Sequence, residues 1–250
     1  MIHSFLLIGQ SNAAGRGFAN EVEPIAPDRI YALRNGRWRR MYVPINPDRG
    51  SSGINLAESF ADLYSKEKDV DVGIIPCADG GTCLDQWAVG GLLFDHACYM
   101  AELASRTSTI AGVLWHQGES DCAEHQYPVY EEKLTIILEA FRKKLGLYDV
   151  PVLLGGLGDY LKDCPINDTF KNYTYVNDAL QRIADKDKMY GFVSAEGLAP
   201  NPDFLHFSAE ALREFGVRYY REFLKLEDKN KVFTEKNYED HASKTNIEML

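Results

Sequence analysis

The sequence predicts an α/β domain in which helices cover both faces of a mostly parallel sheet. Short apolar runs alternate with longer segments whose apolar residues recur at helical spacing, and this alternation is typical of parallel sheets. The chain has 250 residues, of which 45% are hydrophobic and 26% charged, as expected for one globular domain of this class. The sequence contains no internal repeat.

Five apolar runs are predicted to be the strands of this sheet. Each is short and ends at a glycine, a proline or a polar cluster, which indicates a buried strand. In chain order they are residues 5–8, 70–76, 110–116, 150–154 and 190–194.

The intervening segments are predicted to be helices because their apolar residues form one stripe at helical spacing. Asn55 followed by Glu58 matches the start of a helix, and Ser208 is a suitable cap for the last one. The stripes lie within residues 55–64, 92–105, 130–145, 173–183 and 208–223.

Two segments stand outside this alternation. Residues 28–41 contain Asn35-Gly36 between β-like flanks, which predicts a hairpin insertion. Residues 226–250 are polar and charged, so we predict a catalytic domain over residues 1–225 and a tail of unassigned role.

Composition excludes several classes of protein. The formal net charge of −10 disfavours a large nucleic-acid interface, which is built from clustered Lys and Arg. No apolar stretch approaches the ~18–20 residues of a membrane helix, so we expect no membrane partner. Residues 1–5 lead into an apolar segment without a basic region, which predicts a cytoplasmic protein, or a secreted one if a leader was removed.

The five cysteines are predicted to be free thiols. They are odd in number and form no CxxC pair, and structural disulfides are rare in the cytosol. We see no Cys/His clustering with the spacing of a zinc site, and so expect no metal.

A serine follows the first predicted strand, in the run Gly9-Gln10-Ser11-Asn12. A strand-to-helix corner can present such a serine as a nucleophile, although Ser11 could equally cap a helix. Ala13 stands where a G-x-S-x-G elbow has its second glycine, and no Gly-Lys-Ser/Thr marks a phosphate loop. After the second strand, Gly80-Gly81 would let a backbone N–H approach a ligand, or would simply form a tight turn.

Two more polar blocks follow. His116-Gln117-Gly118-Glu119-Ser120-Asp121 comes directly after the third predicted strand; for His116 we favour a structural hydrogen bond over a metal ligand. Asp203 and His206 lie three residues apart before the last helix. That spacing lets the carboxylate hold one ring nitrogen and leaves the other free as a base, but it also occurs in ordinary loops.

A parallel sheet delivers all four blocks to one edge. Together they provide a nucleophile, donors for an oxyanion, a base and a residue that orients the base. This combination fits acyl transfer.

These blocks resemble those of the SGNH/GDSL hydrolase superfamily, and within it most closely the carbohydrate esterase family 6 and sialate O-acetylesterase group. The resemblance spans roughly residues 3–220. It implies a flavodoxin-like three-layer α/β/α sandwich, with a five-stranded sheet here, and removal of O-acetyl groups from carbohydrates such as xylo-oligosaccharides without metal or cofactor.

The resemblance also implies roles for individual residues. Ser11 would be the nucleophile, His206 the base and Asp203 its orienter. The oxyanion hole would consist of the Ser11 amide, the amide of Gly80 or Gly81, and the Gln117 side chain.

Specificity is predicted less sharply. Arg16 could contact sugar hydroxyls or a carboxylate, or form a structural salt bridge, and Trp87 could stack on a sugar or belong to the core. The remaining polar residues of the blocks are candidates for substrate binding or for scaffolding: Gln10, Asn12 and Glu119.

Three alternative functions stay open. They are a sialate O-acetylesterase, a lipid or thioester hydrolase of the same superfamily, and a carbohydrate-binding protein without catalysis. The sequence also leaves self-association into a homo-oligomer open.

Overall fold

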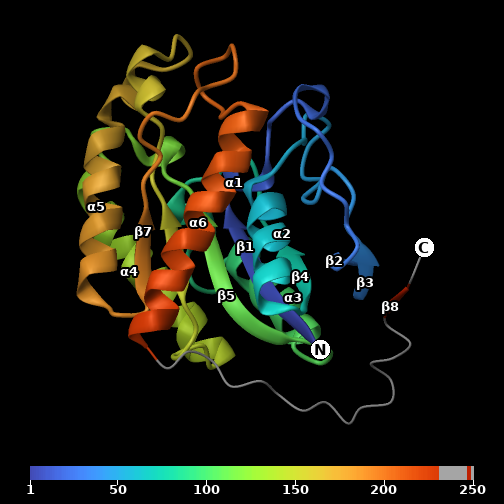
Figure 1. Cartoon of the computed structure of the whole chain (residues 1–250). Coiled ribbons are helices and arrows are strands. Elements are labelled where there is room, and N and C mark those ends of the chain that lie inside the picture. Colours follow the sequence, from blue (N-terminus) through green and yellow to red (C-terminus); the bar gives the residue numbers. More distant parts are fainter. Residues whose placement is uncertain (231–246, 249–250) are drawn as a thin grey trace.

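Strand β1 (Ile2–Gly9) lies in the middle of the sheet in the computed structural model, which describes residues 1–230 and 247–248 (Figure 1). It pairs in parallel with β4 (Asp71–Pro76) on one side and β5 (Thr109–His116) on the other. Beyond β5 follow β6 (Val152–Gly155) and β7 (Tyr190–Val193), also parallel. The five predicted strands are therefore confirmed.

The predicted number of strands in the sheet is wrong, because the hairpin is part of the sheet and not an insertion beside it. Strands β2 (Ile30–Arg34) and β3 (Arg37–Arg40) form the expected antiparallel pair around Asn35 and Gly36, which both have positive φ. Strand β2 also pairs in parallel with β4, so the hairpin extends the sheet to seven strands. The two-residue β8 (Ile247–Glu248) adds to β3 at the edge.

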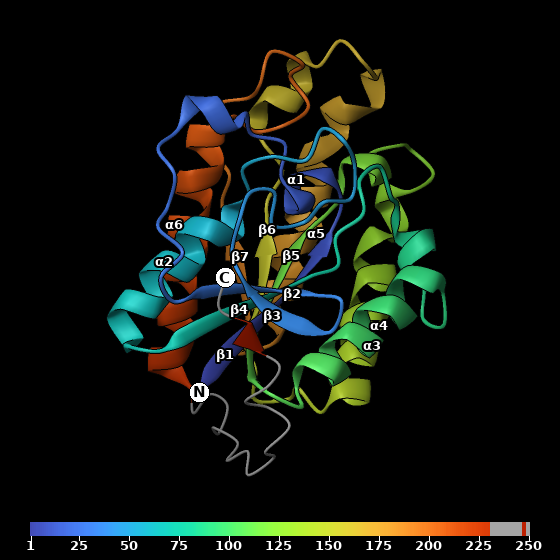
Figure 2. The same cartoon turned by 90° about the vertical axis from the view of Figure 1, so that its right-hand side faces the viewer.

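Helices cover both faces of this sheet, as predicted. Figure 2 shows α2 (Leu56–Lys68) and α6 (Ala209–Lys229) on one face, with α3 (Leu92–Ala104) and α4 (Tyr127–Leu145) on the other. Helix α5 (Tyr173–Lys186) packs beside α4. Right-handed crossovers explain this division, because the chain moves one way along the sheet from β1 to β4 and the opposite way from β4 to β7.

Local sequence signals fix the helix starts. Asn55 caps α2 with a reciprocal capping box in which Glu58 accepts from the Asn55 amide at 2.9 Å. Ser208 caps α6 through its hydroxyl. The shorter helices are α1 (Ser11–Ala14) and the 3₁₀ turns Ala19–Glu21, Leu84–Trp87, Glu119–Asp121, Asp159–Asp163 and Asp168–Asn172.

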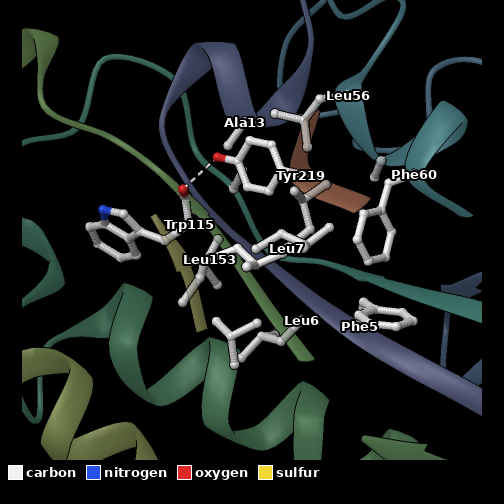
Figure 3. Close-up of a cluster of buried hydrophobic side chains, with 14 of the residues drawn as sticks. Phe5, Leu6, Leu7, Ala13, Leu56, Phe60, Trp115, Leu153 and Tyr219 are labelled. Carbon is white, nitrogen blue, oxygen red and sulfur yellow. Dashed lines mark hydrogen bonds between the residues drawn. The ribbon is translucent and has the colours of Figure 1, made fainter. Parts of the chain in front are cut away.

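The core lies on both faces of β1, which is why that strand reads as a continuous apolar run. Figure 3 shows Phe5 turned toward Phe60 of α2 and Leu6 turned to the opposite face. The Phe5 and Phe60 rings meet edge to face with centroids 4.7 Å apart. Tyr219 of α6 is fully buried, and its hydroxyl donates to the Trp115 carbonyl of β5 at 2.8 Å (Figure 3). This packing ties the central strands to the helix that follows the last loop of the predicted site.

The carboxyl ends of the parallel strands meet at one edge, at the top of Figure 1. The chain changes direction along the sheet around β1, with β4 on one side and β5 on the other. Ligands of doubly wound sheets bind at this kind of switch point. The loops after β1, β4, β5 and β7 carry the four polar blocks.

Of the predicted tail, α6 continues to Lys229 and β8 covers residues 247–248, while 231–246 and 249–250 lie outside the described residues. The five cysteines are free, as predicted. Within the part of the chain that the structure describes, no helix is both long and apolar enough to span a membrane.

Candidate active site

The nucleophile candidate sits at a tight corner between β1 and α1. Gly9 ends the strand with φ +132°, and a Cβ built on it would lie 2.0 Å from the His116 carbonyl oxygen, so only glycine fits. The next amide, of Gln10, donates to that same carbonyl at 2.9 Å. Ser11 then begins α1 and is 6% exposed. The corner therefore holds the serine in one place at the sheet edge.

The structure brings Ser11, His206 and Asp203 together although the serine and the imidazole lie far apart in sequence. His206 Nε2 lies 3.0 Å from the Ser11 hydroxyl oxygen, and His206 Nδ1 lies 2.7 Å from Asp203 Oδ2. The other Asp203 oxygen accepts from the backbone amides of Leu205 and His206 at 2.9 and 3.0 Å. The carboxylate thus holds both the ring and the backbone that carries it.

These hydrogen bonds also decide the charge of Asp203. Partial burial acts to raise its pKa, but the His206 and Leu205 amides and the imidazole outweigh that effect and leave the pKa below the ordinary value. Asp203 is therefore ionised at neutral pH. An ionised acceptor at Nδ1 favours the tautomer with hydrogen on Nδ1, so that the Nε2 lone pair faces Ser11.

Asn12 and Glu119 are both buried, and their side chains bond within the protein. The Asn12 oxygen accepts from the Phe207 amide at 3.1 Å, and its nitrogen donates to the Leu205 carbonyl at 3.2 Å and to Glu119 Oε1 at 2.6 Å. Leu205 and Phe207 flank His206. Asn12 therefore clamps the loop on both sides of the imidazole.

Gln10 is likewise a scaffold residue. Its side-chain oxygen accepts from the amides of Gly118 and Ser120 at 3.1 and 3.3 Å and from Gln117 Nε2 at 3.2 Å. His116 has the expected structural role, since it is fully buried with Nε2 3.1 Å from the Gly156 carbonyl. The block after β5 is thus fastened to the end of β1.

The prediction that the Gln117 side chain donates to an oxyanion is corrected by its contacts. The side chain is 0% exposed, and its N–H groups are directed to the Thr82 carbonyl at 3.1 Å, to Asp121 and to Gln10. No free donor is left for a substrate oxygen. Burial raises the pKa of its partner Asp121 to about 6, although hydrogen bonds from Gln117 and the Leu84 amide oppose the shift.

Of the two roles left open for Arg16, the structure shows the structural salt bridge. Its guanidinium binds both oxygens of Asp48, at 3.0 and 2.7 Å, and the two side chains are only 7% and 5% exposed. Asp48 also accepts from the Gly80 amide at 2.8 Å and from the Ser52 hydroxyl. Burial acts to raise the Asp48 pKa, but Arg16 and Ser52 outweigh it and keep the pKa low.

The contact with Asp48 distinguishes Gly80 from Gly81 as a hydrogen-bond donor. The Gly80 amide is used by Asp48. Within residues 1–230 and 247–248, the N–H groups of Gly81 and Ser11 have no hydrogen-bond acceptor. Gly81 has φ +78°, which suits glycine, and a Cβ built on Gly80 would lie 3.5 Å from the Ser11 Cβ. The glycine pair therefore lies against the serine with one free donor.

Of the two places left open for Trp87, the structure shows the core. It is 0% exposed, meets Trp115 edge to face at 5.6 Å, and donates from its indole nitrogen to Thr82 Oγ1 at 3.0 Å. A buried indole with a satisfied N–H has no face to offer a ligand.

Two residues of the site were missed from the sequence. Asp48 holds Arg16 and Gly80, and Asn46 pairs with both backbone groups of Ala78, at 2.9 and 3.0 Å. The signal was the run Asn46-Pro47-Asp48 between the hairpin and α2, which is typical of a turn. Nothing local indicated that this turn reaches the glycine block.

Ser11, His206 and Asp203 lie in one hydrogen-bonded chain at the switch point of a doubly wound sheet, an arrangement that fits a serine hydrolase of the SGNH type. Among the residues that the structure describes, no cluster of three or more His, Cys, Asp or Glu side chains could hold a metal ion.

A family model described as carbohydrate esterase, sialic acid-specific acetylesterase, matches residues 1–225. The chain belongs to this family and is a carboxylic ester hydrolase. A probable carbohydrate esterase of Arabidopsis thaliana, At4g34215, is 25% identical over 249 residues, covering 88% of this chain and 89% of that relative.

Solved structures agree on the fold. The Arabidopsis protein superposes with a TM-score of 0.78 at 25% identity, covering 89% of this chain and 98% of that one. NanS gives 0.71 at 17% identity, covering 92% and 98% of the two chains. Axe2, an acetylxylan esterase from Geobacillus stearothermophilus, gives 0.53 at 16% identity, covering 88% and 94%.

Proposed function

We propose that this carbohydrate esterase removes O-acetyl groups from neutral sugars, such as acetylated xylo-oligosaccharides, through an acetyl-enzyme on Ser11. The observation that carries the proposal is the chain of hydrogen bonds from Ser11 Oγ to His206 Nε2 at 3.0 Å and from Nδ1 to Asp203 at 2.7 Å. A serine hydroxyl is a weak nucleophile until an adjacent base accepts its proton.

In the first step His206 takes the Ser11 proton while the hydroxyl oxygen attacks the acetyl carbonyl. The imidazolium that forms is stabilised by Asp203, which stays ionised. His206 then returns the proton to the oxygen of the departing sugar, and the acetyl group remains on Ser11. In the second step water takes the place of the sugar, and free Ser11 and acetate are released.

The negative charge that develops on the carbonyl oxygen needs hydrogen-bond donors. Among the described residues, the amides of Ser11 and Gly81 are unused donors close to the serine hydroxyl. Loss of one such donor typically lowers the rate by about 10²–10³-fold. Of the three predicted donors, this proposal keeps the two amides and drops Gln117.

The preference for neutral sugars rests on charge. The buried Arg16 is neutralised by Asp48, and the exposed Arg49 is paired with Asp79 at 2.8 Å. A substrate carboxylate would have to displace one of these partners within a chain of net charge −10. Neutral acetylated sugars meet no such cost.

A sialate O-acetylesterase is the second candidate, and one observation favours it besides the family description. Arg49 is half exposed and, with Asp48 and Asp79, lines a shallow pocket of about 220 Å³ beside the glycine pair. If the Arg49 guanidinium released Asp79 and bound a substrate carboxylate instead, Arg49 would be the cation that a sialate requires.

Acetate release separates the two candidates. We expect kcat/KM for acetylated xylobiose to exceed that for 9-O-acetyl sialic acid by about tenfold or more, a difference of roughly 1.4 kcal/mol. Ser11→Ala should abolish turnover of both. A higher kcat/KM on the sialate, lost in Arg49→Ala, would replace the first candidate with the second.

A further inference from the structure

Phe204 adopts a backbone conformation that its side chain disfavours. Three non-glycine residues with positive φ occur in the part of the chain described, and the other two, Asn35 and Asp69, belong to the residue types that tolerate it. Phe204 has φ +53° and a bulky ring. Conformations of this kind cluster at functional sites, where surrounding contacts enforce them.

The contacts that enforce it belong to the Asp203 turn. Asp203 Oδ1 accepts from the amides of both Leu205 and His206, and the Phe204 amide donates to the Asn201 carbonyl at 3.0 Å. The left-handed residue is what folds the chain back around the carboxylate. Glycine or asparagine would meet this requirement with less strain, so the backbone alone gives no reason for a phenylalanine.

Packing gives no reason either. Phe204 is 41% exposed, whereas the nearby Phe207 is fully buried and Leu205 packs against the core. Across residues 1–230, the Phe204 ring takes part in no ring–ring or cation–π contact. Phe204 thus presents a partly exposed aromatic ring in a strained turn, without a ring or cation partner among the described residues.

Its place in the chain indicates what it contacts. Phe204 lies between Asp203 and His206, in the loop between β7 and α6 that reaches the catalytic edge at the top of Figure 1. In the proposed mechanism the acetyl carbonyl faces the Ser11 and Gly81 amides, while His206 protonates the oxygen of the departing alcohol. The group bound beside the His206 loop is therefore the alcohol, which is the sugar.

We propose that Phe204 is a specificity-determining residue whose exposed ring packs against the apolar C–H face of the departing sugar. This inference rests on the proposed function and adds the residue that selects the alcohol. Aromatic side chains offer large apolar area at low entropic cost, which suits a weakly polar face of a pyranose.

Phe204→Asn tests the proposal, because asparagine accepts the left-handed backbone and removes the ring. We expect kcat/KM for acetylated xylobiose to fall about tenfold, mainly through KM, as one lost apolar contact of this size implies. The fall for ethyl acetate, whose alcohol is too short to reach the ring, should be smaller by about fivefold or more. The melting temperature should stay the same or rise.

Phe204→Tyr keeps the ring and should retain the wild-type ratio between the two substrates. Tyr99→Asn, a substitution of an exposed aromatic on α3, is the matched control and should change neither rate. Equal losses on both esters would overturn the proposal in favour of a role through the Asp203 turn, and unchanged kinetics would overturn it outright. Failure of the wild type to release acetate from any sugar, with ethyl acetate still hydrolysed, would instead remove the proposed function and this inference with it.

Discussion

The two sides of Ser11 differ in exposure and therefore in what their polar residues do. Behind the serine lies a buried polar layer, which we define as Gln10, Asn12, Gln117, Glu119 and Asp121; all five side chains are at most 3% exposed. In front lies the catalytic rim, which we define as Gly81, Asp203, Phe204 and His206. Both regions come from the same sequence blocks. Membership of a motif therefore does not separate the residues proposed to take part in the reaction from those that hold the site in place.

The burial of the side chains separates these two kinds of residue. Most polar atoms in the buried layer have a partner, because a buried group left unpaired costs about 1–3 kcal/mol; the exceptions are Gln117 Oε1 and Glu119 Oε2. Gln10, Asn12 and Gln117 accordingly use their amides to join three loops. The rim keeps the Gly81 amide and the His206 ring nitrogen Nε2 directed to the site. We therefore expect substitutions in the rim to lower turnover and substitutions in the buried layer to lower stability.

The largest effect is expected for Asp203→Asn in the rim. Asparagine cannot stabilise the imidazolium and can reverse the favoured tautomer, so kcat should fall by about 10³-fold. The melting temperature should change little, because Asp203 is partly exposed. Kinetics of p-nitrophenyl acetate hydrolysis and a thermal melt measure both quantities. A fall below tenfold would remove Asp203 from the proposed triad.

Asn12→Ala in the buried layer is expected to lower turnover less than Asp203→Asn does, and to lower stability more. The variant loses hydrogen bonds to Phe207, Leu205 and Glu119, and leaves the Glu119 carboxylate without this donor. We expect unfolding free energy to fall by about 2–4 kcal/mol. Turnover should fall less than in Asp203→Asn, by about tenfold, since His206 loses its clamp but keeps its partners.

Urea denaturation and steady-state kinetics test this contrast on one preparation. Glu119→Gln is the matched variant, because it keeps the shape and an acceptor for Asn12 while removing the charge. The unfolding free energy and the turnover of Glu119→Gln should both lie between those of wild type and Asn12→Ala. Wild-type stability in Asn12→Ala would contradict the division between the two regions.

The smallest effect concerns the pH dependence of stability. Burial raises the Asp121 pKa to about 6, above the ~3.9 of an unfolded aspartate. The folded state therefore holds this proton more tightly. The resulting stabilisation is complete below about pH 4 and is lost as the pH rises through 6, with a total of roughly 2–3 kcal/mol.

Unfolding free energies of wild type and Asp121→Asn, measured in urea from pH 4 to pH 7.5, isolate this contribution. The difference between the two proteins should change by about 2 kcal/mol across that interval, with wild type losing stability relative to the variant as pH rises. A difference that is constant with pH would show that Asp121 titrates alike in both states.

The features predictable from the sequence were those that local patterns encode. Apolar runs gave the five strands, Asn55 and Ser208 gave helix starts, and Asp203 with His206 gave a pair that a single turn can join. Residue type also placed Ser11 at the corner after β1, where the structure finds it within hydrogen-bond distance of His206.

The features that were missed depend on contacts between distant segments. Arg16 meets Asp48 across 32 residues, and Gln117 meets the Thr82 carbonyl across 35, so neither partner could be read from its neighbours. The sequence around Trp87 does not distinguish a surface position from a core position, because its ring partner Trp115 is distant in the chain. The hairpin was recognised, but its parallel pairing with β4 required the folded sheet.

Covalent labelling of Ser11 tests the central claim most directly. A p-nitrophenyl phosphonate should phosphonylate wild type once, at the peptide carrying Ser11, with loss of esterase activity in step with the labelled fraction. Asp203→Asn should react far more slowly, and Ser11→Ala should take up no label. Full activity in a stoichiometrically labelled protein, or an equal label on Ser11→Ala, would contradict Ser11 as the nucleophile.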